Sequence, residues 1–187
     1  MSEKHDVVVV NVVGSGSLAA EFDLEKVAAD IGSIAEYDPD KYPAMYLRLR
    51  EDTPLVTLYR TGKYIITGAD SEDRAHAMRE RFLDLLSDNG IIVEPDDKRF
   101  QIQNLVCTAN LGEALNLNAL AIGLGLESTE YEPEQFPGLI YRPSKADSVV
   151  LLFASGRVVI TGSPDIDAAE QTFTALEDEV TNLLTID

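Results

Sequence analysis

The chain has 187 residues, 45% of them hydrophobic, which suits one domain or two closely packed halves with a substantial core. It carries 33 acidic against 15 basic residues, a formal net charge of −18, and one cysteine, Cys107. A single cysteine excludes an internal disulfide and the usual zinc ligand sets, and we expect no cofactor. No apolar run reaches the ~18 residues of a membrane span, so we expect a soluble, cytoplasmic protein.

The acidic charge has two interpretations. It is either an ordinary solvated surface or an adaptation to molar salt, where the Debye length falls to ~3 Å and self-repulsion is screened. Taken alone, it argues against nucleic acid, whose phosphates attract lysine and arginine. The basic residues, however, are concentrated in two similar stretches: Arg48, Arg50, Arg60, Lys63, Arg142, Lys145 and Arg157.

Periodicity and turn residues predict one order of elements in the first half of the chain. The expected elements are a strand at 6–13, a loop GSGSLAAE, a helix at 23–31 ended by Gly32, strands at 42–50, 54–59 and 63–67, and a long helix at 71–89.

The second half repeats this order. The expected elements are a strand at 101–108, a helix at 115–124, strands at 136–142, 148–153 and 157–161, and a final helix capped by Ser163 and Pro164.

The two halves are copies of each other. DPDKYPAMYLRLREDTPLVTLYRTGKYIITG, from 38 to 68, aligns with EPEQFPGLIYRPSKADSVVLLFASGRVVITG, from 132 to 162, at a constant spacing of 94 residues. Asn11 and Asn104 correspond at a spacing of 93. We therefore expect two pseudo-symmetric repeats, 1–95 and 96–187, in an α+β fold with all helices on one face of an antiparallel sheet.

The other sheet face is expected to be apolar too. Strand alternation places Val159 and Thr161 opposite Val158 and Ile160, so both faces of this strand carry apolar groups. A sheet face without helices is normally polar, and an apolar one requires a ligand or a partner to cover it.

No catalytic arrangement is recognisable. Residues 14–19 fit the dinucleotide pattern G-x-G-x-x-A, but the corresponding loop of the second half lacks it and no series of βαβ units follows, so we interpret it as a flexible loop. His5 and His76 are expected to face solvent.

Long stretches of the chain resemble the TATA-box-binding protein family of archaeal and eukaryotic general transcription factors. The resemblance covers about residues 7–184, and EPEQFPGLIYR, VVLLFASGRVVITG and IQNLV are its most specific matches. It implies a saddle-shaped, curved antiparallel sheet with helices on its convex face. It also implies a non-enzymatic initiation factor that binds and bends the minor groove of TATA-box DNA, here in a halophilic archaeon.

The resemblance also assigns roles to residues. The intercalating aromatic pairs correspond to Tyr42, Tyr59, Phe136 and Phe153. The residues that contact bases or the groove floor correspond to Asn11, Val13, Ile65, Thr67, Asn104, Val106, Val159 and Thr161. The phosphate contacts correspond to Arg48, Lys63, Arg142 and Arg157. An apolar floor suits A·T pairs, which have no exocyclic amine in the minor groove.

Partners follow from the same resemblance. Glu132 and Glu134 match the loop that the family presents to transcription factor B, which joins RNA polymerase at the promoter, although simple solvation also explains two glutamates. The chain departs from the family in having tyrosine at both first-repeat wedges, which predicts a kink there that is weaker or differently placed. It also departs in a long helix, 71–89, of mixed charge. The alternative function is an obligate homodimer, or another protein-interaction module, that uses the apolar face and has lost DNA binding.

Overall fold

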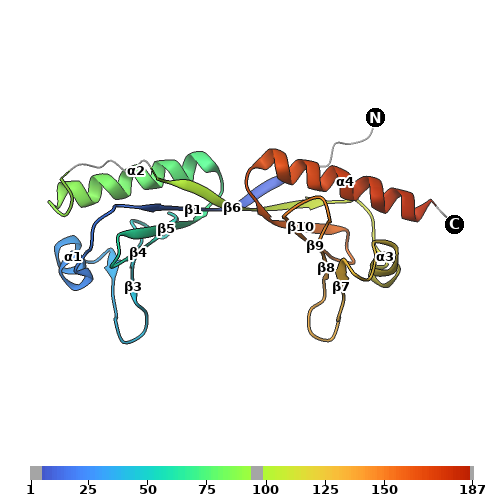
Figure 1. The fold of residues 1–187 in the computed structure, drawn as a ribbon, viewed down its shortest axis with the longest axis horizontal. Coiled ribbons are helices and arrows are strands. Elements are labelled where there is room, and N and C mark those ends of the chain that lie inside the picture. The colour runs from blue at the N-terminus through green and yellow to red at the C-terminus, as the bar shows by residue number, and fades with distance from the viewer. Residues whose placement is uncertain (1–5, 94–98, 186–187) are drawn as a thin grey trace. The chain divides into compact units, whose positions relative to one another are not determined.

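The computed structural model describes residues 6–93 and 99–185 (Figure 1); His5 and the expected boundary between residues 95 and 96 lie outside these ranges. The chain divides into two compact units. The N-terminal unit is Asn11–Gln103, and the C-terminal unit is Asn104–Asp187 together with Met1–Val10, each within the described ranges. No helix in the part described is long and apolar enough to cross a membrane.

The first repeat contains five strands and two helices. They are β1 (Val8–Ser17), α1 (Leu24–Ile31), β2 (Ala35–Glu36), β3 (Ala44–Leu47), β4 (Leu55–Tyr59), β5 (Lys63–Ala69) and α2 (Glu72–Asp88). The strands pair antiparallel in the order β2-β3-β4-β5-β1. Helix α2 lies along one face of this sheet (Figure 1).

The second repeat has the same order of elements. They are β6 (Gln101–Asn110), α3 (Leu117–Gly123), β7 (Thr129–Glu130), β8 (Leu139–Tyr141), β9 (Val149–Leu152), β10 (Arg157–Ser163) and α4 (Ile166–Leu184). The antiparallel order β6-β10-β9-β8-β7 mirrors that of the first repeat. The α+β fold built from two repeats is therefore confirmed, with one short strand in each repeat, β2 and β7, that periodicity did not predict.

Side-chain caps determine where the helices begin. The Asp23 carboxylate accepts a hydrogen bond from the Lys26 N–H at the start of α1, and the Ser71 hydroxyl accepts one from the Arg74 N–H at the start of α2. Both starts were predicted. The predicted cap of the final helix was wrong, because Asp165 caps α4 and Ser163 still belongs to β10. The Ser163 hydroxyl is buried and lies 2.8 Å from that of Ser148, the residue before β9, a contact that the sequence pattern does not reveal.

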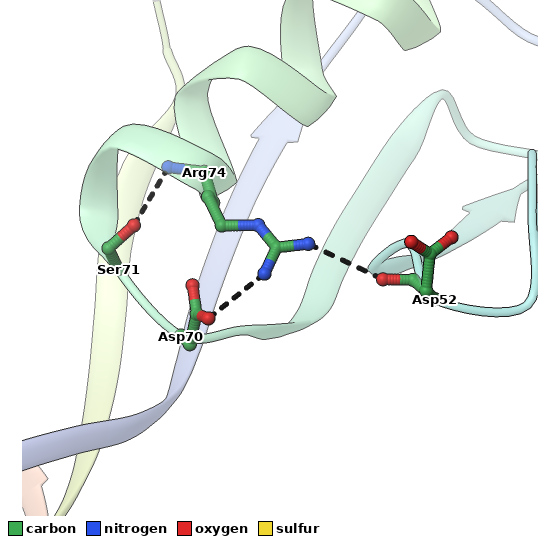
Figure 2. A network of polar contacts seen from close by, with 4 residues as sticks. All are labelled: Asp52, Asp70, Ser71 and Arg74. Carbon is green, nitrogen blue, oxygen red and sulfur yellow. Dashed lines mark hydrogen bonds and ion pairs between the residues drawn. The ribbon is translucent and has the colours of Figure 1, made fainter.

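Arg74 is one of the basic residues on the mixed-charge helix α2, and it has a structural role. Its Nη1 donates to Asp70 Oδ2 at 2.9 Å and its Nη2 donates to the Asp52 carbonyl at 3.4 Å. Figure 2 shows Arg74 reaching both the residue before the helix cap and the loop between β3 and β4. This arginine therefore connects α2 to its own sheet.

The segment predicted as a flexible loop after the first strand is part of that strand. Strand β1 continues to Ser17, and Gly14 and Gly16 are buried strand residues. The Phe100 ring lies against Gly14, where a Cβ would collide with it. Glycine is therefore required here for close packing of an aromatic ring, and an antiparallel sheet offers no dinucleotide-binding turn.

The core of each unit lies between its sheet and its helices. Strand residues that alternate toward the helices are fully buried, as Leu58, Tyr64 and Ile66 are beneath Phe82 of α2. In the second repeat Leu105, Cys107, Val158 and Ile160 are buried in the same way, as the alternation predicted. Burial raises the pKa of the Cys107 thiol, which keeps this side chain a neutral, inert core residue.

The turn before β5 depends on glycine for two reasons. Gly62 has φ +80°, and a Cβ there would collide with the carbonyl oxygen of Ala20, whereas Gly90 has φ +68° and open space around it.

We expect Gly62→Ala to lower the free energy of unfolding by more than about 2 kcal/mol, and Gly90→Ala by about 1 kcal/mol through its backbone conformation alone. Chemical denaturation in molar salt measures both. Equal losses would show that the collision has no energetic effect.

Candidate nucleic-acid interface

Each sheet has a second face on which its helices do not pack, and we call it the open face. On β10, Val159 and Thr161 are half-buried, while Val158 and Ile160, which alternate with them, are buried. On β5, Ile65 and Thr67 show the same pattern. Cross-strand pairing extends these faces, since Thr161 lies opposite Val106 of β6. The predicted floor residues Val13, Val106, Ile65, Thr67, Val159 and Thr161 are therefore all on open faces, within their own units.

A bulge near the end of β10 positions the asparagine of the second repeat. The pairing of β10 with β6 shifts register between Thr161 and Ser163, so Gly162, with φ +88°, has no partner in the ladder. Its N–H donates instead to Asn104 Oδ1 at 2.6 Å. Because the amide oxygen is held in this way, the Asn104 Nδ2 is left as the donor, and its contact within residues 6–93 and 99–185 is a long one, 3.5 Å to Thr161 Oγ1.

The first repeat contains the same combination of a bulge, a glycine and an asparagine. The pairing of β1 with β5 shifts register between Val12 and Gly14, and the Gly68 N–H donates to Asn11 Oδ1 at 2.8 Å. Gly68 has φ +92°. Sequence reasoning identified the asparagines and missed the glycines that orient them. The repeated Ile-Thr-Gly at 66–68 and 160–162 was the signal for these bulges.

The predicted wedge residues form an aromatic pair in each unit. The Phe136 and Phe153 rings meet edge to face with centroids 6.0 Å apart. Gly138 allows this contact, because a Cβ there would lie 2.7 Å from the Phe136 ring. Tyr42 and Tyr59 form the equivalent pair with centroids 6.5 Å apart, and their hydroxyl oxygens are 3.1 Å apart. Sequence reasoning missed a third ring here, Tyr46, which stacks on Tyr42.

The four predicted phosphate contacts are exposed and lie at the ends of strands. Lys63 and Arg157 begin β5 and β10, one after each tight turn. Arg48 directly follows β3, and its Nη1 donates to the Thr53 carbonyl at 3.1 Å. Arg142 directly follows β8, and its Nη1 lies 3.6 Å from Glu130 Oε2. The last pair leaves a carboxylate next to a candidate phosphate site.

The two glutamates predicted to contact a protein partner lie in a short turn before Phe136. The N–H groups of Gln135 and Phe136 both donate to the Glu132 carbonyl at 2.9 Å. This arrangement leaves the Glu132 and Glu134 side chains exposed. They are next to a wedge residue but do not lie on a strand of the open face, so a second protein could reach them.

Comparisons of the sequence and of the structure with known proteins lead to the same family. A family model described as "Transcription factor TFIID (or TATA-binding protein, TBP)" matches residues 6–89 and 99–183. TATA-box-binding protein C of Halobacterium salinarum is 50% identical over 179 residues, 95% of this chain and 99% of that protein. The TATA-box-binding protein of Haloarcula marismortui is 42% identical over 184 residues, 98% of each chain. The solved Methanococcus jannaschii TBP superposes with a TM-score of 0.84 and 40% identity, covering 95% of this chain and 99% of that one.

The asparagine geometry leads to a direct test of the interface. Asn104→Asp retains the acceptor for the Gly162 N–H but replaces the amide donor with a negative oxygen. We expect affinity for an A·T-rich duplex to fall by about 10- to 100-fold, as for loss of one good base contact with added repulsion. Fluorescence anisotropy in molar salt measures this.

Asn116→Asp is the matched control. Asn116 Oδ1 accepts from the Ala119 N–H at 3.1 Å as the cap of α3, and aspartate serves equally well there. This variant adds the same charge and should bind like the parent protein. Equal affinity for Asn104→Asp and the parent would remove Asn104 from the interface.

Proposed function

Since the chain belongs to the TATA-box-binding protein family of general transcription factors, which are not enzymes, we propose that it binds and bends the minor groove of TATA-box DNA with the open faces of both repeats. In this proposal the promoter-bound protein recruits transcription factor B through Glu132 and Glu134, and through it RNA polymerase. It acts in the cytoplasm, at the nucleoid. Two repeats divided near residues 95 and 96 contribute equivalent halves of the binding surface.

The observation that carries this proposal is that both repeats place an oriented asparagine side chain within an apolar surface. In each repeat an asparagine presents amide N–H groups among half-buried valine, isoleucine and threonine side chains. The minor groove of A·T pairs offers only acceptors, adenine N3 and thymine O2, and has no amine to prevent close apolar contact. A donor surrounded by an apolar floor matches that groove.

The aromatic pairs support bending. A ring pair at the edge of each open face can enter between base pairs and unstack one step, which kinks the duplex toward the major groove. Phe136 is 36% exposed and Tyr42 39% exposed, so both pairs are accessible to a ligand. The proposed phosphate contacts, Arg48, Lys63, Arg142 and Arg157, fix the position along the backbone without reading sequence.

The acidic surface leads to an unusual expectation for the dependence of binding on salt. Four phosphate contacts alone give a slope of about −3.6 in log affinity against log salt, because each releases counterions. Carboxylates beside these contacts, such as Glu130 at 3.6 Å from Arg142, can bind cations when DNA approaches. Uptake of cations by the protein then offsets their release from DNA.

We therefore expect a flat or rising affinity for a TATA-type duplex toward molar potassium chloride, with weaker binding of a G·C-substituted duplex throughout. A filter-binding series measures both. A slope near the value for four simple phosphate contacts would contradict the salt mechanism. Failure to bind the TATA-type duplex, together with a dimer in sedimentation, would instead favour the homodimer through the apolar face.

One substitution tests the mechanism at a single residue. Glu130→Gln removes a proposed cation site, so its slope should become more negative by up to about one unit. Glu170→Gln changes the same charge on an exposed position of α4 and should leave the slope unchanged. Identical slopes for both variants would show that Glu130 binds no cation in the complex.

A further inference from the structure

The two aromatic pairs differ in chemistry. Tyr42, Tyr46 and Tyr59 of the first repeat correspond, 94 residues on, to Phe136, Ile140 and Phe153 of the second. We call the first set the tyrosine trio. It carries three hydroxyl groups, whereas the equivalent side chains of the second repeat contain only carbon and hydrogen.

The side chains of the trio are in contact, and two of their three hydroxyls form a hydrogen bond. Tyr42 and Tyr59 oxygens are 3.1 Å apart, and the Tyr42 and Tyr46 rings stack with centroids 5.4 Å apart and planes 12° apart. The hydrogen bond with Tyr42, and then burial, raise the pKa of Tyr59. Burial, followed by repulsion from and hydrogen bonding to Tyr42, raises the pKa of Tyr46. These two phenols are therefore neutral at any physiological pH, and each retains its proton.

The three phenols have unused hydrogen-bonding capacity. Each phenol oxygen can donate once and accept through its lone pairs. Contacts within the trio occupy some of these positions and leave acceptor lone pairs for a ligand. The trio is also accessible, since Tyr42 is 39% exposed and Tyr46 and Tyr59 are half-buried. Phe136 is 36% exposed, so the equivalent aromatic sets of the two repeats differ in polarity more than in accessibility.

We propose that the tyrosine trio is a hydrogen-bonding site for the exocyclic amine of guanine, so that the first repeat accepts a G·C pair at its end of the DNA element while the second repeat requires A·T. The guanine amine is the one donor that base pairs present in the minor groove. Beside Phe136 and Phe153 it loses water without gaining a partner, whereas a phenol oxygen can accept from it. A protein with two similar halves thereby acquires a direction on DNA. This inference rests on the proposed DNA-binding function.

The experiment measures the orientation of the protein on a duplex. An A·T-only element is compared with one that carries a single G·C pair at one end. An iron chelate that cleaves nearby DNA is attached through Pro39→Cys or Pro133→Cys, two exposed, repeat-equivalent positions that lie three residues before a wedge residue. Cys107 is fully buried and does not react with the reagent in the folded protein.

We expect the Pro39→Cys conjugate to cleave at the G·C end and the Pro133→Cys conjugate at the A·T end. The preference should be about 10-fold, which is typical for the discrimination at one base pair. Cleavage of both ends to equal extents, or the opposite orientation, overturns the inference. Absence of binding to the A·T-only element instead overturns the proposed function, so the two failures are distinguishable.

Variants assign the effect to the hydroxyls. The triple variant Tyr42→Phe, Tyr46→Ile and Tyr59→Phe gives the first repeat the side chains of the second. It should lose the orientation preference, and its affinity for the G·C-ended element relative to its affinity for the A·T-only element should be about 10-fold lower than in the parent.

Two further variants keep the test conclusive. Tyr42→Phe removes only the central hydroxyl and should weaken the preference even if the triple variant does not fold. Tyr37→Phe removes a hydroxyl from a side chain that packs against the core of the same unit and should retain the full preference. Full preference in Tyr42→Phe, or an equal loss in Tyr37→Phe, contradicts the assignment to the trio.

Discussion

The period-two alternation of the β-strand is the constraint on which this protein depends. In each repeat the helices bury one row of strand side chains completely, as with Val158 and Ile160, and leave the other row half-buried, as with Val159 and Thr161. Both rows are apolar enough to need cover, but each unit has helices packed against one face. The helices thus cover only one face of each sheet, and the other face is available for a ligand.

A second constraint gives the apolar face its polar specificity. A β-bulge leaves one backbone N–H without a partner in the ladder, and in both repeats an asparagine oxygen accepts it. Satisfying this unpaired backbone N–H fixes the orientation of the side-chain amide. The same local irregularity therefore stabilises the strand pair and positions a hydrogen-bond donor, which is why Asn11 and Asn104 each occur with a glycine of positive φ, Gly68 or Gly162.

Much of this structure could be predicted from the sequence, because regular periodicity and an internal repeat are strong signals. The α+β class, the long helices and the faces of the strands all followed from them. The wrong or missing predictions occur where the local sequence carries no side-chain pattern, or where a contact joins residues that are far apart in the sequence. Gly14 and Gly16 carry no pattern, so β1 was predicted too short, and the cap at Asp165 was displaced because Ser163 pairs with Ser148 instead. Nothing local to Tyr46 indicates its contact with Tyr42.

The central claim, that the open faces bind the A·T minor groove, is tested most directly with inosine. Inosine·cytosine pairs carry the major-groove groups of G·C but lack the guanine amine, so their minor groove resembles that of A·T. The account predicts that a duplex with inosine·cytosine in place of every A·T pair binds within about 10-fold of the A·T element, while guanine·cytosine at the same positions abolishes binding. Equal loss with inosine and guanine would contradict the account, because it would place recognition in the major groove.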